Sequence, residues 1–255
     1  MTDDFGQSDF AVRMAWGWAG ASVCRADVTV VVDVLSFSTA VTVVVERGTR
    51  VFPSAWSDER ARALASEHDA VLAVGRAESR ADGAVVAPSL SPAALLDAEA
   101  IPRLVLPSPN GSAIAAAAAD VGSVVVIGCL RNARAVATWL AGQLDEGRSV
   151  AVVAAGERWP TDGSLRPAVE DHLGAGAILS RLSELGHGAA GSPEATTSAA
   201  LFDACAQGLG EILRECVGGR ELRAAGFGAD VAVAAALDVS PVVPVLADGA
   251  FVAHV

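Results

Sequence analysis

Short apolar runs rich in Val alternate along this chain with longer stretches in which apolar residues recur every three or four positions. The short runs have the length and β-branched composition of buried strands, and the longer stretches have the period of helices that bury one face. The predicted strands are residues 28–34, 50–53, 70–74, 103–106, 123–127, 150–154, 242–246 and 251–253. The predicted helices are residues 38–46, 59–67, 92–98, 112–118, 133–144 and 169–185, followed by an almost wholly helical region over 193–236 with a break at Gly218-Gly219. This alternation predicts an α/β fold built in layers.

The length of 255 residues and a hydrophobic content of 52% favour one domain over residues 1–255 with a large core, preceded by a short flexible segment over residues 1–9. The longest apolar stretches, residues 28–45 and 112–130, are interrupted by Asp33 and Asp120. A membrane helix needs roughly 18 or more uninterrupted apolar residues, so these stretches predict strands joined to helices and no membrane partner. A homodimer is an expectation from general frequency alone.

The charge of the chain excludes several classes of function. The net charge is −12, which argues against nucleic acid as a partner, because binding to nucleic acid requires clustered basic residues. All 18 basic residues are Arg, so a Schiff-base lysine and a phosphate-binding P-loop lysine are both excluded, and with them a nucleotide-binding kinase. The first residues lack the pattern of a secretory signal, and the four cysteines have no CxxC spacing. We therefore expect a cytoplasmic protein with free thiols.

Chemistry-bearing residues gather where predicted strands end. Asp33 ends the first predicted strand, and the hydroxyls of Ser38 and Thr39 follow at the start of a helix. An acid at this place suits a metal ion and the hydroxyls suit a phosphate, whereas the alternative is an ordinary helix cap. The aspartyl-phosphatase pattern is not supported, because Leu35 and Phe37 occupy the positions of its second Asp and its Thr.

Two more clusters follow later strands. Asn110, Gly111 and Ser112 form a turn that opens an Ala-rich helix, where backbone N–H groups can hold an anion, although Asn-Gly is also a common tight turn. Arg131 and Asn132 lie at the next strand-to-helix junction and could reach an anion. The alternative for this second cluster is a surface Arg beside a helix-capping Asn.

Acidic residues complete the set of candidates. Residues 155–158, which include Glu157, follow another strand, and Glu170 and Asp171 lie on the next helix, where adjacent side chains point about 100° apart. Asp230 and Asp238 bound a later helix and are interpreted as caps. The four histidines lack the spacing of a metal site or a catalytic triad.

From about residue 28 to residue 244, the order of these clusters resembles the 2-phosphosulfolactate phosphatase family. The matching pieces are Asp33-Val34-Leu35, Ser38-Thr39, Glu46-Arg47-Gly48, Gly75-Arg76, Ser91-Pro92, Asn110-Gly111-Ser112, Gly128, Asn132, Ala155-Gly156, Glu170-Asp171, Ala175-Gly176, Asp238 and Val243-Pro244. The resemblance implies a three-layer α/β/α sandwich with a mixed, largely parallel sheet. It also implies Mg²⁺-dependent hydrolysis of (R)-2-phospho-3-sulfolactate to 3-sulfolactate and phosphate, a step of coenzyme M biosynthesis.

Together with this resemblance, the clusters give a specific hypothesis for the site. Asp33, with Glu170 or Asp171, holds Mg²⁺, while Ser38, Thr39 and the loop of Asn110, Gly111 and Ser112 bind phosphoryl oxygens. Arg76, or Arg131 beside Asn132, holds a second anionic group of the substrate. In the family, Arg usually stands where this chain has Ser36, and a Gly-Glu-Arg motif is reduced here to Gly75-Arg76-Ala77. The alternative is therefore a relative that binds a phosphate ester or acidic metabolite without hydrolysing it.

Overall fold

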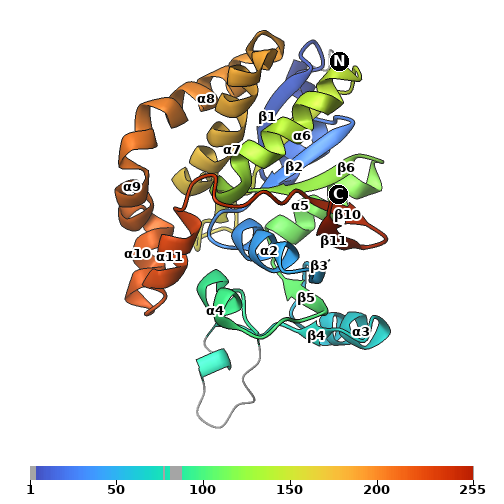
Figure 1. The fold of residues 1–255 in the computed structure, drawn as a ribbon, viewed down its shortest axis with the longest axis vertical. Helices are drawn as coiled ribbons and strands as arrows, with labels where there is room; N and C mark the ends of the chain where they lie inside the picture. Colours follow the sequence, from blue (N-terminus) through green and yellow to red (C-terminus); the bar gives the residue numbers. More distant parts are fainter. Residues whose placement is uncertain (1–3, 77, 81–87, 255) are drawn as a thin grey trace.

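A mixed sheet of nine strands forms the middle of the molecule (Figure 1). The computed structural model describes residues 4–76, 78–80 and 88–254. The strand order is β1-β7-β2-β6-β10-β11-β3-β5-β4. These strands are β1 (Val12–Trp16), β2 (Val28–Val32), β3 (Arg50–Ser54), β4 (Val71–Leu72), β5 (Arg103–Pro107), β6 (Val124–Gly128), β7 (Val150–Ala154), β10 (Pro244–Ala247) and β11 (Ala250–Ala253).

The sheet consists of two parallel groups joined by one antiparallel hairpin. β1, β7, β2 and β6 are parallel, and β3, β5 and β4 form a second parallel group. The hairpin of β10 and β11 lies between the groups and pairs antiparallel with β6 on one side and β3 on the other. A mixed and largely parallel sheet is therefore confirmed.

Both faces of the sheet are buried under helices, which explains why its strands are continuously apolar. Val30 and Val32 of β2 belong to the core formed with α6 (Ala133–Asp145), α7 (Val169–Leu182) and α8 (Pro193–Cys205). Val31 points to the opposite core, formed with α2 (Phe37–Glu46) and α5 (Gly111–Asp120). The side-chain period of two in a strand thus serves two helical layers, and the α/β/α sandwich is confirmed.

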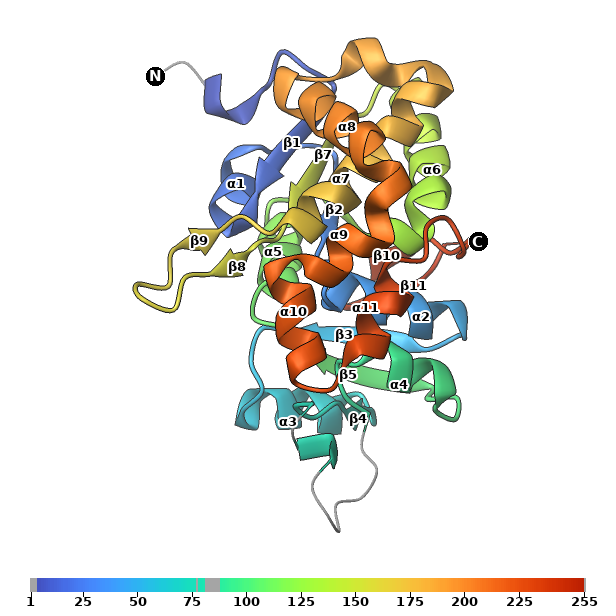
Figure 2. The ribbon, with the colours of Figure 1, turned by 90° about the vertical axis from the view of Figure 1, so that its left-hand side faces the viewer.

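Smaller elements complete the two layers. α1 (Gly17–Val23) packs near β1 and α5, α3 (Glu59–Glu67) covers β5, and α4 (Pro92–Asp97) lies against α2. A short hairpin of β8 (Glu157–Arg158) and β9 (Leu165–Arg166) projects from the body beside β1 and α1 (Figure 2). The sequence pattern predicted neither β1 nor α1 nor this hairpin.

The region after residue 193 forms four helices with boundaries that differ from the prediction. α8 is followed by a 3₁₀ turn and then by α9 (Leu209–Glu215), α10 (Val217–Ala224) and α11 (Gly228–Ala234). The predicted break at Gly218-Gly219 is wrong, because the chain bends at Cys216 and both glycines lie inside α10. A Cβ at Gly219 would lie 1.8 Å from the carbonyl oxygen of Leu213, so this glycine serves the close approach of α10 to α9.

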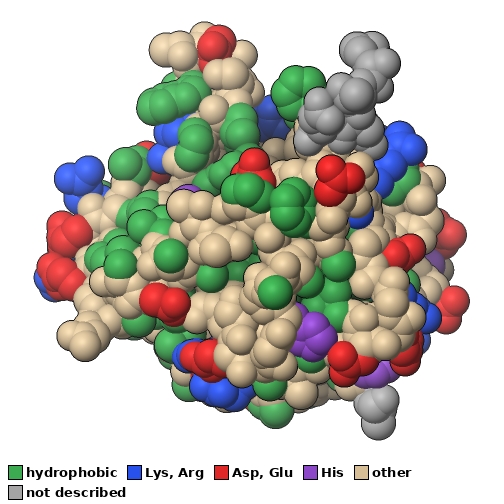
Figure 3. Space-filling view, turned by 90° about the horizontal axis from the view of Figure 1, so that it is seen from above, with side chains coloured by type: hydrophobic (Ala, Val, Ile, Leu, Met, Phe, Trp, Pro, Cys, Tyr) green, Lys and Arg blue, Asp and Glu red, His purple; other side chains and the backbone are tan. Residues whose placement is uncertain are grey.

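The remaining expectations concern the surface and the cysteines. None of the helices in the described ranges is long and apolar enough to cross a bilayer. On the face drawn in Figure 3, basic side chains are interspersed with acidic and hydrophobic ones and form no continuous basic strip. All four cysteines are free, with Cys24 and Cys129 buried and Cys205 and Cys216 half-buried. Within the predicted flexible segment, residues 1–3 lie outside the described residues, whereas Asp4–Gly6 forms a 3₁₀ turn.

Candidate active site

Asp33 lies immediately after β2, where the loop that follows β5 meets it. Its Oδ2 accepts hydrogen bonds from the Gly111 backbone N–H at 3.1 Å and from the Ser108 hydroxyl at 3.4 Å. Its Oδ1 accepts from the Phe37 N–H at 3.3 Å. The position of Gly111 requires glycine, because a Cβ there would lie 2.9 Å from Asp33 Oδ2 and 2.4 Å from the Phe37 ring. The structure thus brings together two clusters that are 78 residues apart in the sequence.

Asp171, in the first turn of α7, connects the ends of two neighbouring strands. Its Oδ1 accepts from the Val34 N–H at 2.7 Å, and its Oδ2 accepts from the Gly156 N–H at 2.8 Å. Val34 follows β2 and Gly156 follows β7, so one carboxylate holds both strand ends in place. These contacts are short, and they give Asp171 a positioning role.

Glu170 precedes Asp171 and points toward a different element. Its side chain is buried, and a Cβ at Gly218 in α10 would lie 2.5 Å from its Oε1. Burial and the nearby Glu170 carboxylate raise the pKa of the Cys216 thiol to about 12. Cys216 is the N-cap residue of α10, so the first turn of α10 lies beside Glu170. The late helical region therefore contributes to the site, which the sequence did not indicate.

Glu157, at the start of the β8–β9 hairpin, is a fourth carboxylate at this place. Its Oε2 accepts from the side-chain amide of Asn110 at 3.1 Å, so Asn110 uses its side chain here and not as a cap of α5. A cavity of about 240 Å³ adjoins Asn110 and Glu157 and is walled by Trp16, Trp18 and Leu165. The residue was visible in the sequence among positions 155–158, but nothing in the pattern ranked it above its neighbours.

Burial and repulsion by neighbouring carboxylates disfavour the charged forms of Asp33, Glu157 and Asp171. Burial raises the pKa of Asp33 to about 6, with a contribution from the charge of Glu170, although the N–H groups of Phe37 and Gly111 act in the opposite direction. Burial, and then the charge of Asp33, raises the pKa of Glu157 to about 7. Burial and the charges of Asp33 and Glu170 raise the pKa of Asp171 well above its usual value. The four acids therefore share one electrostatic environment.

Carboxylate oxygens are the ligands that Mg²⁺ prefers, so the chemistry of this donor set fits that ion. Within the described ranges, no three His, Cys, Asp or Glu side chains are grouped as a complete metal site. Mg²⁺ commonly uses one or two carboxylates together with water and substrate phosphate, and Asp33 and Glu170 can provide those two.

Several other predicted residues make internal hydrogen bonds. The hydroxyl of Ser38 donates to the Val31 carbonyl at 3.0 Å, and that of Thr39 donates to the Val34 carbonyl at 2.8 Å. Both side chains are fully buried, so both hydroxyls stabilise the β2–α2 turn, and their contact with a phosphate stays a prediction. The buried amide of Asn132 donates to the carbonyls of Ile127 and Val242. This geometry has a structural role, and the contact of Asn132 with substrate likewise stays a prediction.

Two buried polar atoms have no hydrogen-bond partner among the described residues. They are the hydroxyl oxygen of Ser112, in the first turn of α5, and Nε of Arg131. Arg131 donates through Nη1 to the Val233 carbonyl of α11 at 3.1 Å. Ser112 adjoins Gly111, whose N–H contacts Asp33, so its unpartnered hydroxyl lies next in sequence to the carboxylate site.

Arg76 contacts the β2–α2 turn and α11. Its Nη2 donates to the Ser36 hydroxyl at 2.5 Å, and its Nε pairs with Asp230 of α11 at 3.1 Å. Ser36 is only three residues from Asp33, so a guanidinium lies beside the β2–α2 turn. Ala77, the next residue of the reduced motif, lies outside the described residues.

The fold and this geometry can be compared with known proteins. A family model described as 2-phosphosulpholactate phosphatase matches residues 21–249. The chain belongs to this family. The match spans Asp33, the loop before α5, the acids of α7 and the α10–α11 region. Membership implies a phosphatase, a hydrolase of phosphoric monoesters, which confirms the resemblance seen in the motifs. No curated protein matches the chain.

Proposed function

We propose that this chain is a Mg²⁺-dependent phosphatase of small acidic phosphate esters, with (R)-2-phospho-3-sulfolactate as substrate and 3-sulfolactate and phosphate as products. The observation that supports it most is the convergence of Asp33, Glu157, Glu170 and Asp171 at the ends of β2 and β7, beside the first turn of α5. Asp33, Glu157 and Asp171 have raised pKa values, and together with the buried Glu170 they form a site suited to a cation and its anionic partner. Family membership supplies the reaction class.

In this proposal, Asp33 and Glu170 hold the metal. When bound, Mg²⁺ would neutralise negative charge on the phosphoryl oxygens. Asp171 fixes the ends of β2 and β7 through the N–H groups of Val34 and Gly156, and so keeps Asp33 in place. Positioning and charge neutralisation are the main demands of phosphoryl transfer, which this rigid arrangement meets.

The start of α5 receives the phosphate. The first N–H groups of a helix have no partner inside the helix and favour an anion. The unpartnered hydroxyl of Ser112 is a further donor there, while Gly111 holds Asp33 and Asn110 holds Glu157. The phosphate would therefore bind between the metal ligands and the helix N-terminus.

Glu157 handles the proton. A general acid or base works best when its pKa lies near the working pH, and burial raises the pKa of Glu157 to about 7. The side-chain amide of Asn110 donates to Oε2 of Glu157 and fixes the carboxyl group. Glu157 can thus take a proton from an attacking water or give one to the leaving oxygen.

The test is phosphate release from a panel of phosphorylated hydroxy acids, including (R)-2-phospho-3-sulfolactate, with Mg²⁺ and with a chelator. Magnesium-dependent turnover of a carboxylate or sulfonate ester is the expected result. No release from any ester, combined with thermal stabilisation by the same esters, would refute the phosphatase and favour the binding protein. Ser36 and the reduced Gly75-Arg76-Ala77 motif are the reason to include that second readout.

A further inference from the structure

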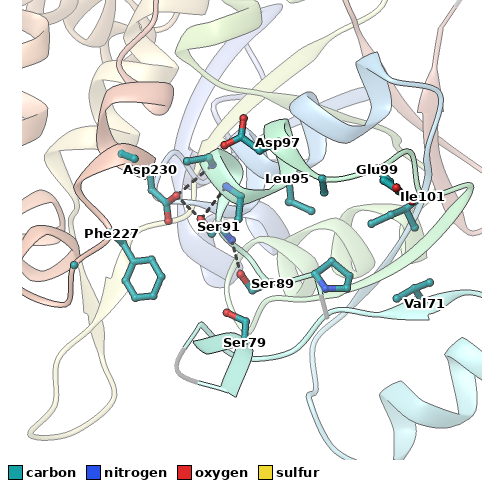
Figure 4. Close-up of a pocket in the computed structure, with 16 residues that line it drawn as sticks. Val71, Ser79, Ser89, Ser91, Leu95, Asp97, Glu99, Ile101, Phe227 and Asp230 are labelled. Atoms are coloured by element: carbon teal, nitrogen blue, oxygen red, sulfur yellow. Dashed lines mark hydrogen bonds between the residues drawn. The ribbon is translucent and has the colours of Figure 1, made fainter. Parts of the chain in front are cut away.

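Asp230, which the sequence suggested as a helix cap, is the centre of a buried network that joins three segments. Its side chain is only 1% exposed. Its Oδ1 accepts from the Ser91 hydroxyl at 2.5 Å and from the Ala93 N–H at 3.2 Å, and its Oδ2 accepts from Arg76 Nε at 3.1 Å. Figure 4 shows Asp230 pointing at Ser91 across the start of α4. The acid caps α4 and not its own helix.

The network uses only some of the hydrogen-bond donors of the Arg76 guanidinium. Nε donates to Asp230, and Nη2 donates to the Ser36 hydroxyl and, at 3.1 Å, to the Leu90 carbonyl. A guanidinium has five N–H donors, and Nη1 carries two of them. No described residue accepts a hydrogen bond from Nη1, and the side chain is 19% exposed, so it can be reached from solvent. Two donors are therefore available to a ligand.

The network also fixes the direction in which those donors point. Asp230 holds Nε, Ser36 and Leu90 hold Nη2, and the guanidinium lies 5.6 Å from the centre of the Phe227 ring. A planar group held along one edge presents its remaining edge in a fixed orientation. Ser36, which accepts from Nη2, follows Asp33 by three residues, so the guanidinium lies beside the turn that carries Asp33. Asp230 and Ser91 also line a hollow of about 670 Å³ between α4 and α11 (Figure 4).

We propose that Asp230 is a positioning residue that orients Arg76 to bind the second anionic group, a carboxylate or sulfonate, of a phosphate ester held at the carboxylate site. This inference rests on the proposed function for the phosphate, but it concerns selectivity among esters. Because Asp230 neutralises Arg76, the contact depends on directed hydrogen bonds more than on net charge. The protein should therefore distinguish esters that carry a second anion from esters of the same shape that lack it.

The experiment measures the dissociation constants of two matched esters by calorimetry, with Mg²⁺ present, and phosphate release in parallel. 2-Phospholactate carries a carboxylate where isopropyl phosphate carries a methyl group. In Asp230→Asn, the amide oxygen can still accept from Ser91 and Ala93, but the amide nitrogen cannot accept from Arg76. We expect affinity for 2-phospholactate to fall about 10-fold or more, as charge-assisted hydrogen bonds suggest, and affinity for isopropyl phosphate to stay the same.

Two variants separate positioning from general damage. Asp238→Asn removes a similar acid, which pairs with Arg181 at 2.9 Å near the far end of α7, and should leave both affinities unchanged. In an Arg76→Ala protein, the Asp230→Asn change should have no further effect on either ester. An equal loss for both esters in Asp230→Asn, or no preference of the wild type for 2-phospholactate, would overturn the inference. Absence of turnover with the predicted pattern of affinities would refute the phosphatase alone.

Discussion

Two sets of buried or half-buried acids in this protein have opposite surroundings. Asp230 and Asp238 each form an ion pair with an arginine, Arg76 or Arg181, and each accepts an N–H at the start of another helix. In the described part of the chain, no arginine forms an ion pair with Asp33, Glu157, Glu170 or Asp171. Their hydrogen-bond partners are N–H groups, a hydroxyl and an amide. Arg166, opposite Glu157 in the β8–β9 hairpin, acts on the pKa of Glu157 through its charge and forms no ion pair with it.

The difference separates acids that hold other protein groups in place from acids suited to bind a cation. A buried charge is costly unless it is paired, so acids that position other groups, as Asp230 positions Arg76, are expected in ion pairs like those of Asp230 and Asp238. Carboxylates kept close together without a cation lower the stability of the protein and suit a site that receives a cation. The comparison therefore places the chemistry at the unpaired acids by their electrostatic surroundings and not by the volume of a cavity, since a hollow of about 670 Å³ adjoins the paired acid Asp230.

Asp33→Asn against Asp238→Asn should give the largest contrast. Asp33→Asn removes a proposed metal ligand and should lower kcat/KM at least about 10²-fold, the scale seen when one transition-state contact is lost. Asp238→Asn should instead lower the free energy of unfolding by about 1–3 kcal/mol, because it removes one of the two carboxylates that pair with Arg181, the other being Glu184. Phosphate release and thermal unfolding of both variants check this. Similar activities for the two proteins would remove the distinction between the sets.

Gly218→Ala should have an intermediate effect through Glu170. The new Cβ would lie 2.5 Å from Glu170 Oε1, the end of a flexible side chain, so the fold can adapt while the carboxylate moves. We expect Mg²⁺-dependent kcat/KM to fall about 10-fold, as expected for displaced groups close to the chemistry. The matched control is Gly210→Ala on the exposed face of α9, where a Cβ meets nothing within 4 Å. If both variants keep wild-type activity, α10 does not belong to the site.

Thr39→Ala should have the smallest effect on activity. The buried hydroxyl donates to the Val34 carbonyl, so its loss should reduce stability by about 1 kcal/mol and change kcat/KM by less than about threefold. Urea unfolding and steady-state kinetics measure the two quantities. A large fall in kcat with unchanged stability would instead support the catalytic role predicted from the sequence for this hydroxyl.

Much of the fold follows from local pattern. β2 and β7 are buried on both faces, so their Val-rich runs stand out, and the prediction for β7 matches residues 150–154. β1 was not predicted, because Arg13 and the mixed residues around it give neither alternation nor a continuous apolar run. The β8–β9 hairpin has two residues in each strand, too few for any periodicity.

Part of the site could be predicted from local pattern, because its residues follow the ends of predicted strands. Asp33, Gly111 and the acids of α7 meet because strand ends converge, and a strand-end rule can anticipate this. Asn132 and Arg131 differ, since their partners, Val242 and Val233, come from a segment about a hundred residues later in the chain. The roles of Gly218 and Asp230 likewise depend on tertiary contacts of helices that look like ordinary surface helices in the sequence.

The most direct test of the unpaired acids is the stability of the metal-free protein at pH 5 and pH 8, with and without Mg²⁺. Raised pKa values mean that the folded state binds more protons than the unfolded state, so stability should fall as the pH rises from about 4 toward 7. Burial lowers the pKa of His172, which acts in the opposite direction, so Glu157→Gln serves as the reference.

We expect the wild type to lose on the order of 2–4 kcal/mol between pH 5 and pH 8 relative to Glu157→Gln, and Mg²⁺ to stabilise the wild type more at pH 8 than at pH 5. Equal stability of wild type and variant at both pH values, with no effect of Mg²⁺, would contradict a cation site at these carboxylates.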